Sequence, residues 1–240
     1  MMAENRTWSR TPAADLDEHA LHIWRVPIGH TGRALAHLDT VLSADERRRA
    51  DRFALEKPRT AYIVARGTLR LLLGRYLDRD PATLRFAYGE HGKPALEDGA
   101  LHFNLSHSGD LALLAFAADR PVGVDIEFRR DRVSSDAIAQ RFFAADEVEA
   151  LQALGENQRK EAFFRIWTRK EAYLKALGAG ITVALDSFSV NTATQAALLR
   201  PAAEASTWRL HHLDPGSGYT GAVCAPGPWN LNCRQWDPDL

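Results

Sequence analysis

The sequence is poor in the residues that mark several classes of protein. It has two cysteines in 240 residues, Cys224 and Cys233, too few for a disulfide framework or a cysteine-based zinc site. The formal net charge is −1, so no basic field of the whole molecule favours nucleic acid. No apolar stretch is long enough to cross a bilayer, and the first residues lack the apolar run of a signal peptide. These absences predict a soluble cytoplasmic protein with no nucleic-acid or membrane partner.

Several motifs of nucleotide-binding and hydrolytic folds are also missing. The chain has no Walker A loop and no Gly-x-Gly-x-x-Gly turn, so ATP-binding and dinucleotide-binding folds are unsupported. It has no Gly-x-Ser-x-Gly elbow of the kind that presents a nucleophilic serine. Hydrophobic residues make up 45% of the chain, enough for one large domain or two small ones.

A weak internal repeat runs through the chain. "SADE" (Ser43–Glu46) recurs 101 positions later as "AADE" (Ala144–Glu147). At the same offset, the helical pattern of residues 59–73 falls on that of residues 160–174. Chance matching of two helical patterns is the alternative, but two coincidences at one offset favour a duplicated unit.

Each half predicts a short helix start, a longer amphipathic helix and then strands. We expect strands at residues 101–105, 111–117 and 121–128, with "SHSGD" as a hairpin turn between the first two. Helices alternate irregularly with antiparallel strands, which predicts an α+β fold. The halves are expected at residues 1–119 and 120–240, with an irregular tail from about residue 226.

The segment "RIWTRKEAYLKALG" (Arg165–Gly178) predicts a helix with a charge in its apolar stripe. Lys170 falls near the centre of the apolar face, where a buried ammonium needs an anion or loses its proton. We expect Lys170 to form a buried pair with a carboxylate. Glu171 and Lys175 lie one turn apart at the edge of the same face.

Two carboxylates on one strand suggest a cation site. In "GVDIE", Asp125 and Glu127 are two positions apart, so they point to the same face and repel each other unless a cation joins them. Solvated surface acids are the alternative. Oxygen ligands without cysteine suit Mg²⁺ or Mn²⁺ rather than zinc, and Glu171 could supply a third carboxylate.

Two further residues are candidates for binding an anion. His107 lies in "NLSHSGD", where a satisfied loop histidine is the ordinary interpretation and a phosphate donor the functional one. A Ser-His-Asp triad of sequence neighbours is not a working arrangement. Lys93, beside Gly92 in "HGKP", could approach a nucleotide closely, although this segment is also typical of an ordinary turn.

Taken together, these motifs resemble those of a known family. "GVDIE", followed about forty residues later by "WTRKEAYLK", is similar to the phosphopantetheinyl transferase pattern of Gly-x-Asp-x-Glu and Trp-x-x-Lys-Glu-Ala-x-x-Lys. "SADERRRADRF", "GKP", "FNLSHSGD", "LDSFSV" and "DPGSGYTGAVCA" extend the resemblance to the larger, surfactin-synthetase-activating (Sfp) type. The resemblance covers residues 42 to 225.

This resemblance implies a fold and an activity. The fold is a pseudo-dimer of two similar α+β halves with the active site in the cleft between them, so we expect a monomer to be active. The activity is Mg²⁺-dependent transfer of the 4′-phosphopantetheine arm of coenzyme A to a serine of apo acyl, peptidyl or aryl carrier proteins. Adenosine 3′,5′-bisphosphate is the by-product.

The resemblance also implies roles for the acidic motifs and the residues near the diphosphate. Carried over residue by residue, Asp125, Glu127 and Glu171 are similar in position to the magnesium ligands. His107 and Lys175 are similar to contacts of the diphosphate.

Other residues carry over to the nucleotide and to proton transfer. Arg49 and Arg59 resemble the basic residues that hold the 3′-phosphate of coenzyme A. Lys93 resembles an adenosine-side contact and Ser106 a phosphate-side contact. Glu147 is similar in position to an acid that helps to deprotonate the acceptor serine.

The chain departs from the family pattern at two positions. Glu46 stands where a better-known member has a lysine near the 3′-phosphate, which puts the charge of that subsite in doubt. Ala144 replaces the hydroxyl of a helix cap, which would leave Glu147 without its local partner. A metal-dependent phosphodiesterase and a non-catalytic coenzyme A-binding or carrier-binding protein are the alternative functions.

Overall fold

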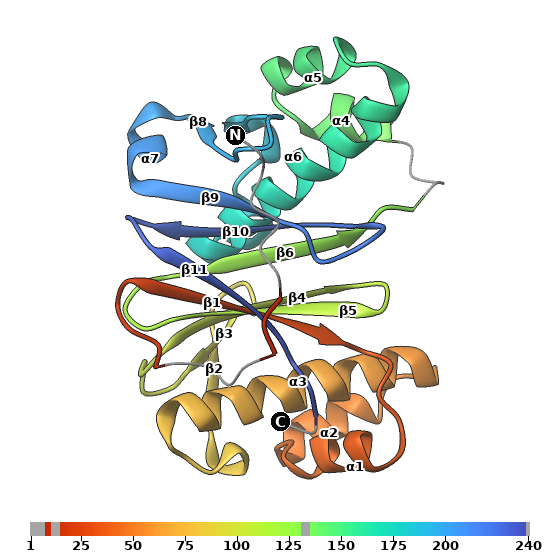
Figure 1. The fold of residues 1–240 in the computed structure, drawn as a ribbon, viewed down its shortest axis with the longest axis vertical. Coiled ribbons are helices and arrows are strands. Elements are labelled where there is room, and N and C mark those ends of the chain that lie inside the picture. Colours follow the sequence, from red (N-terminus) through yellow and green to blue (C-terminus); the bar gives the residue numbers. More distant parts are fainter. Residues whose placement is uncertain (1–7, 11–14, 131–134, 239–240) are drawn as a thin grey trace.

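The computed structural model describes residues 8–10, 15–130 and 135–238. Figure 1 shows four stacked layers: helix α6 (Glu156–Leu177), a three-stranded sheet, a four-stranded sheet, and helix α3 (Glu56–Leu77). Helices and antiparallel strands are mixed, as the α+β prediction requires.

The N-terminal unit runs from a strand through three helices to a strand hairpin. Its middle strand β5 is antiparallel to both neighbours, β1 and β4. A small hairpin of β2 and β3 follows a 3₁₀ helix after α3. The bounds are β1 (Ala20–Pro27), α1 (Gly32–Thr40), α2 (Ala44–Ala50), η1 (Pro81–Thr83), β2 (Phe86–Tyr88), β3 (Pro94–Leu96), β4 (His102–Ser108) and β5 (Leu111–Ala117).

The C-terminal unit follows the same order. In its sheet, β10 lies between β6 and β9 and is antiparallel to both. Short elements connect α6 to this final hairpin. The bounds are β6 (Gly123–Phe128), α4 (Ser135–Phe142), α5 (Ala145–Gln152), η2 (Gly180–Thr182), η3 (Leu185–Ser187), β7 (Ser189–Val190), β8 (Leu198–Arg200), α7 (Ala202–Thr207), β9 (Trp208–Leu213) and β10 (Tyr219–Pro226).

The two units therefore share one order of elements and one pattern of strand pairing. The short helices α2 and α5 begin 101 positions apart, as the sequence repeat predicts, but the long helices α3 and α6 begin at Glu56 and Glu156. The start of the long helix is thus one residue closer to the start of the short helix in the second unit. Along the long helices Arg70 therefore corresponds to Lys170, where the sequence offset places it opposite Glu171.

The segment after Pro226 is not the irregular tail that the sequence predicts. Asn230–Gln235 forms strand β11, which pairs in parallel with β1 and completes the four-stranded sheet. The prediction was wrong because β11 gains its partner from the start of the chain. A division at 119/120 would separate β11 from the sheet to which it belongs.

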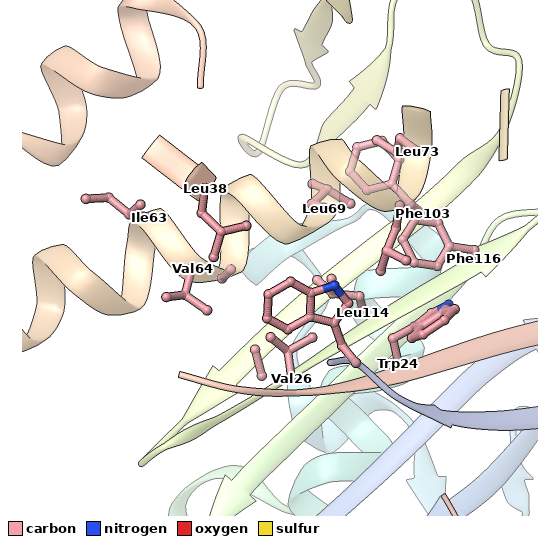
Figure 2. Packing of buried hydrophobic residues seen from close by; sticks show 14 of the residues in the cluster. Trp24, Val26, Leu38, Ile63, Val64, Leu69, Leu73, Phe103, Leu114 and Phe116 are labelled. Carbon is pink, nitrogen blue, oxygen red and sulfur yellow. The ribbon is translucent and has the colours of Figure 1, made fainter. Parts of the chain in front are cut away.

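Three apolar clusters fill the spaces between the layers. One packs α3 against the four-stranded sheet, and Figure 2 shows Leu69 and Leu73 of α3 close to Trp24 and Phe116 from the strands. A second packs α6 against its own sheet. The third lies between the two sheets and joins side chains of both units, including Ile23 of β1. The sheets thus share a core rather than meeting through solvent.

Local signals explain several helix ends. The Ser43 backbone N–H donates to Glu46 Oε2 (2.9 Å), so the predicted capping-box contact starts α2. Helix α6 ends at Gly178, whose φ of 71° suits glycine. Among the described helices, none combines the length and apolar character needed to span a bilayer.

Candidate active site

The edges of the two sheets meet through side chains of β4. Val124 N–H donates to Asn104 Oδ1 (2.9 Å), and Phe128 N–H donates to Ser108 Oγ (3.0 Å). Residues 104, 106 and 108 share one face of β4 because side chains alternate along a strand. The sequence predicts Ser106–Ser108 in a turn, but they belong to the strand, and the turn begins at Gly109. This β4–β6 seam brings the serines of one unit to the acids of the other.

Asp125 lies at the centre of the seam. Its Oδ1 atom accepts hydrogen bonds from Ser106 Oγ (2.8 Å) and Lys175 Nζ (2.6 Å), and Lys175 Nζ also lies 3.0 Å from Ser106 Oγ. Asp125 is 3% exposed, and its buried Oδ2 atom has no hydrogen-bond partner. Burial raises the pKa of the Asp125 carboxyl, while Lys175 and Ser106 oppose that rise.

Two further carboxylates lie within electrostatic range of Asp125. Glu127, on the same strand, accepts a hydrogen bond from Ser108 Oγ (2.9 Å). Burial raises the pKa of the Glu127 carboxyl, and so does the charge of Asp125. The hydrogen bond from Ser108 acts in the opposite direction, but the pKa remains raised. On α6, the pKa of Glu171 is raised by burial and by the charges of Asp125 and Glu127. Such mutual repulsion indicates three acids gathered where a cation would stabilise them.

Gly123 allows strand β6 to pack closely against helix α6. A Cβ atom on Gly123 would lie 2.1 Å from Ala172 O and 2.3 Å from Ala176 N, so β6 can press against α6 only without a side chain there. The contact holds the β6 acids beside the turn of α6 that carries Glu171 and Lys175. The glycine of "GVDIE" therefore has a packing role.

The donor set fits a hard divalent cation. It offers three carboxylates and no thiolate, and the Asp125 Oδ2 atom is buried without a partner. In the part of the chain that the structure describes, however, no three His, Cys, Asp or Glu side chains already surround a common point. The Lys175 ammonium neutralises Asp125 instead.

His107 lies on the other side of β4 from Ser106 and Ser108, and it is exposed. Partial burial of the ring and then the charge of Lys175 lower the pKa of His107. The imidazole thus lies within electrostatic range of the seam and is neutral at neutral pH.

Lys93 reaches the end of α6. Its Nζ atom donates to the carbonyl oxygens of Lys175 (2.5 Å) and Val122 (3.2 Å). Burial lowers the pKa of Lys93 to about 8. The ammonium is therefore directed into the protein, a placement that the "GKP" turn alone does not signal.

Arg49 and Arg59 lie near each other on α2 and α3. The Arg49 guanidinium is 5.4 Å from the ring of Tyr62, which is one turn from Arg59, and Arg59 Nη2 lies 3.3 Å from Asp51 Oδ1. Arg49 thus lies in α2 and Arg59 in the first turns of α3. Close to Arg59 in sequence, Lys57 Nζ contacts Asp110 Oδ1 (2.8 Å) in the turn after β4, so the start of α3 lies beside this turn.

Glu147 does not join this group. It is 2% exposed, and its carboxylate lies 2.8 Å from Lys170 Nζ and accepts from the N–H groups of Ala144 (2.9 Å) and Val190 (2.8 Å). The proposed role in deprotonating the acceptor serine does not fit a carboxylate enclosed in this way. The expected loss of its local partner is also wrong, because the Ala144 backbone still donates to it.

Lys170 forms the buried pair with a carboxylate that its position predicts. Besides Glu147, its Nζ atom contacts the carbonyl oxygens of Leu185 and Phe188, each at 2.6 Å, and it is fully buried. Nothing local in the sequence connects residues 147 and 170.

Glu46 likewise lies in the core rather than at a phosphate subsite. Its carboxylate contacts Arg66 Nε and lies 2.5 Å from Arg70 Nε, and it is 2% exposed. Although burial acts to raise it, the two arginines and the Ser43 N–H lower the pKa of Glu46. It therefore adds no free negative charge to the surface near Arg49.

A cavity of about 580 Å³ lies elsewhere, between α1, α3 and the end of the described chain. Its lining includes Arg33, His37, Leu72 and Trp236, and none of the predicted site residues. The candidate active site is thus the β4–β6 seam and the end of α6.

Two family models match the chain. Residues 121–224 match the family described as the 4′-phosphopantetheinyl transferase superfamily, and residues 27–119 match the family described as 4′-phosphopantetheinyl transferase, N-terminal. The first of these matches contains the acids of β6 and the α6 motif.

Curated relatives cover between 68% and 92% of the chain. The 4′-phosphopantetheinyl transferase HetI of Nostoc sp. is 38% identical over 226 residues, covering 92% of this chain and 94% of that protein. The 4′-phosphopantetheinyl transferase Sfp of Bacillus subtilis is 32% identical over 191 residues, covering 78% of this chain and 83% of that protein. AcpT of Salmonella typhimurium is 38% identical over 163 residues, covering 68% and 76%.

The chain therefore belongs to the 4′-phosphopantetheinyl transferase superfamily. Members of this family transfer the 4′-phosphopantetheine group of coenzyme A to carrier proteins. The resemblance found in the sequence motifs is confirmed.

Proposed function

We propose that the chain carries out this transfer at the β4–β6 seam, in a cleft between two units that form a pseudo-dimer. The acceptor serine Oγ attacks the β-phosphorus of coenzyme A. The bond from this phosphorus to the bridging oxygen breaks, that oxygen leaves with adenosine 3′,5′-bisphosphate, and the serine proton passes to water. The observation that carries the proposal is the meeting of Asp125, Glu127, Glu171 and Lys175 where the units join. The shared order of elements in both units supports the pseudo-dimer.

Asp125, Glu127 and Glu171 would hold a divalent cation, Mg²⁺ or Mn²⁺. When bound, the cation supplies positive charge to the diphosphate as negative charge develops there. The unpartnered Asp125 Oδ2 atom and the raised pKa of each acid support this assignment. It also gives a reason for gathering three like charges together.

The chain's own cations and donors have separate tasks. Lys175 provides an ammonium beside the diphosphate, with Ser106 as a neighbouring donor, and both already contact Asp125. His107, exposed and neutral, donates a hydrogen bond to a phosphate oxygen. Arg49 and Arg59, at the start of α3, bind the 3′-phosphate.

The N-terminal unit would hold the nucleotide end of coenzyme A and the C-terminal unit the cation. We further propose that the protein works in the cytoplasm and as a monomer, because both sides of the seam come from one chain. Sedimentation during turnover tests the monomer. Activity confined to a dimer would contradict it.

The function is tested with a panel of apo acyl, peptidyl and aryl carrier proteins incubated with coenzyme A and Mg²⁺. We expect at least one carrier to gain the mass of one phosphopantetheine group, with release of adenosine 3′,5′-bisphosphate. A chelator should stop the gain, and Mn²⁺ should restore it.

The alternatives give different outcomes in the same assay. Release of the bisphosphate without any carrier would indicate a phosphodiesterase. Binding of coenzyme A without mass gain on any carrier would indicate a non-catalytic binding protein.

A further inference from the structure

The hairpin turn before β3 lies against the end of α6, across the boundary between the units. A Cβ on Gly178 would lie 3.9 Å from Lys93 Cδ, and one on Gly180 would lie 2.7 Å from His91 Cβ. The turn "HGKP" thus covers the loop that follows the helix. The N-terminal unit thereby contacts the helix turn that carries Lys175.

The Lys93 side chain makes this contact specific. Helix ends leave their last four carbonyl groups without helical partners, and the Lys175 carbonyl is one of these in α6. An ammonium there satisfies the oxygen and interacts favourably with the helix dipole. The same ammonium reaches the Val122 carbonyl, which directly precedes β6. One cation therefore ties the end of α6 to the start of β6.

These two elements carry the central pair of the site. Lys175 is held at its carbonyl by Lys93 and at its ammonium by Asp125, so both ends of the residue are fixed. The hairpin is itself anchored to α3, because Arg66 Nη2 donates to Tyr88 Oη (3.1 Å) and the guanidinium lies 4.1 Å from the ring centre of Phe86. The position of Lys93 is thus set by the N-terminal unit.

We propose that Lys93 is a positioning residue, which fixes the last turn of α6 so that Lys175 reaches Asp125 and the diphosphate. The proposal rests on the proposed function of the seam. It differs from the adenosine contact that the family resemblance implies, because the ammonium acts through the protein backbone. Its two hydrogen-bond partners are both backbone carbonyl oxygens of the C-terminal unit.

The test compares Lys93→Met, which keeps the length but removes the donor, with Lys93→Arg, which keeps a cation. Transfer to an apo carrier protein is followed at varied coenzyme A concentration. We expect Lys93→Met to lower kcat by about tenfold to a hundredfold, the cost of a misplaced catalytic group, with a nearly unchanged KM for coenzyme A. Lys93→Arg should recover part of kcat. The control Arg79→Met removes an exposed pair with Asp98 in the same unit and should leave both constants unchanged.

A double-variant cycle with Lys175→Met separates positioning from general destabilisation. If Lys93 acts through Lys175, Lys93→Met should cost little further rate in the Lys175→Met background. Equal costs in both backgrounds would overturn the proposal, and so would a raised KM with intact kcat. If Lys93→Met does not fold, the test uses Lys93→Arg. A lowered kcat with an unchanged KM would then support the proposal, and a raised KM with an intact kcat would overturn it. If the unaltered protein transfers no phosphopantetheine to any carrier, the proposed function itself is overturned.

Discussion

In each unit, a glutamate in the first turn of the short helix forms a buried ion pair, but its partners differ between the units. In the N-terminal unit Glu46 meets two arginines, Arg66 and Arg70, whereas in the C-terminal unit Glu147 meets the single Lys170. Arg70 and Lys170 occupy equivalent positions of the long helices. Both units therefore share a buried ion pair between the short and the long helix. Only the N-terminal unit adds a second cation, Arg66.

The long helices of the two units also differ in what their side chains contact. The arginines of α3 also hold the segment that leads into the β2–β3 hairpin, since Arg70 Nη1 donates to the carbonyl oxygens of Pro81 (2.7 Å) and Leu84 (3.1 Å). On α6 the equivalents of Leu71 and Arg75 are Glu171 and Lys175, which face the seam. Under the proposed function, one unit uses its helix for support and the other for the reaction.

The largest expected effect is a loss of stability when the buried Glu147–Lys170 pair is broken. Lys170→Met strands the Glu147 carboxylate in the core and should lower the free energy of unfolding by roughly 3–5 kcal/mol. Urea unfolding followed by circular dichroism measures the loss. Glu147→Leu combined with Lys170→Met should recover much of it, because no charge is then left buried without a partner.

The equivalent buried glutamate of the N-terminal unit, Glu46, provides a second measurement of the same kind. Glu46→Leu strands two guanidinium groups and should destabilise at least as much as Glu147→Leu. A smaller loss for Glu46→Leu would mean that the two glutamates do not play equivalent parts.

The second effect concerns activity rather than folding. Lys175→Met removes an ammonium that is 28% exposed at the seam, and it should lower the transfer rate about 10²–10³-fold with little change in Tm. Asp125→Asn should likewise abolish most transfer. Arg75→Met, at the equivalent position of α3, is the matched control and should leave the rate unchanged. Comparable losses for Arg75→Met and Lys175→Met would show that chemistry is not confined to one unit.

The smallest effect is a pH dependence that both units share. Burial lowers the pKa of His22 in β1 and of His212 in β9 to about 4. The unfolded chain then binds more protons than the native state between pH 6.5 and 4, so stability falls as the pH falls through this window. Urea midpoints at pH 7, 6 and 5 should decrease, and less steeply for His22→Gln. An unchanged slope for that variant would mean that His22 is not the titrating group.

Local patterns in the sequence were sufficient for much of the fold. The strand predicted at residues 111–117 is β5 itself, and the capping spacing of Ser43 and Glu46 starts α2. Periodicity alone placed Lys170 in the core with a carboxylate. The first two features depend on residues within a few turns of one another, whereas the carboxylate that pairs with Lys170 comes from Glu147 on a different helix.

What local patterns do not show depends on partners distant in sequence. Glu147 has the spacing of a cap but owes its enclosure to Lys170 and Val190. Lys93 sits in an ordinary turn, yet its bonds reach residue 175. The pairing of Asn104, Ser106 and Ser108 with β6 could have been suspected, because short polar side chains alternate there along one strand face.

The parallel pairing of β11 with β1 sets an order of events during synthesis. The sheet of the N-terminal unit gains its last strand only after residues 230–235 have left the ribosome, and by then the C-terminal unit has been made. Until that moment β1 presents an unpaired edge in which Leu21 and Ile23 are destined for burial. The nascent first unit is therefore incomplete on its own, and a chain shortened before residue 230 would expose that edge for good.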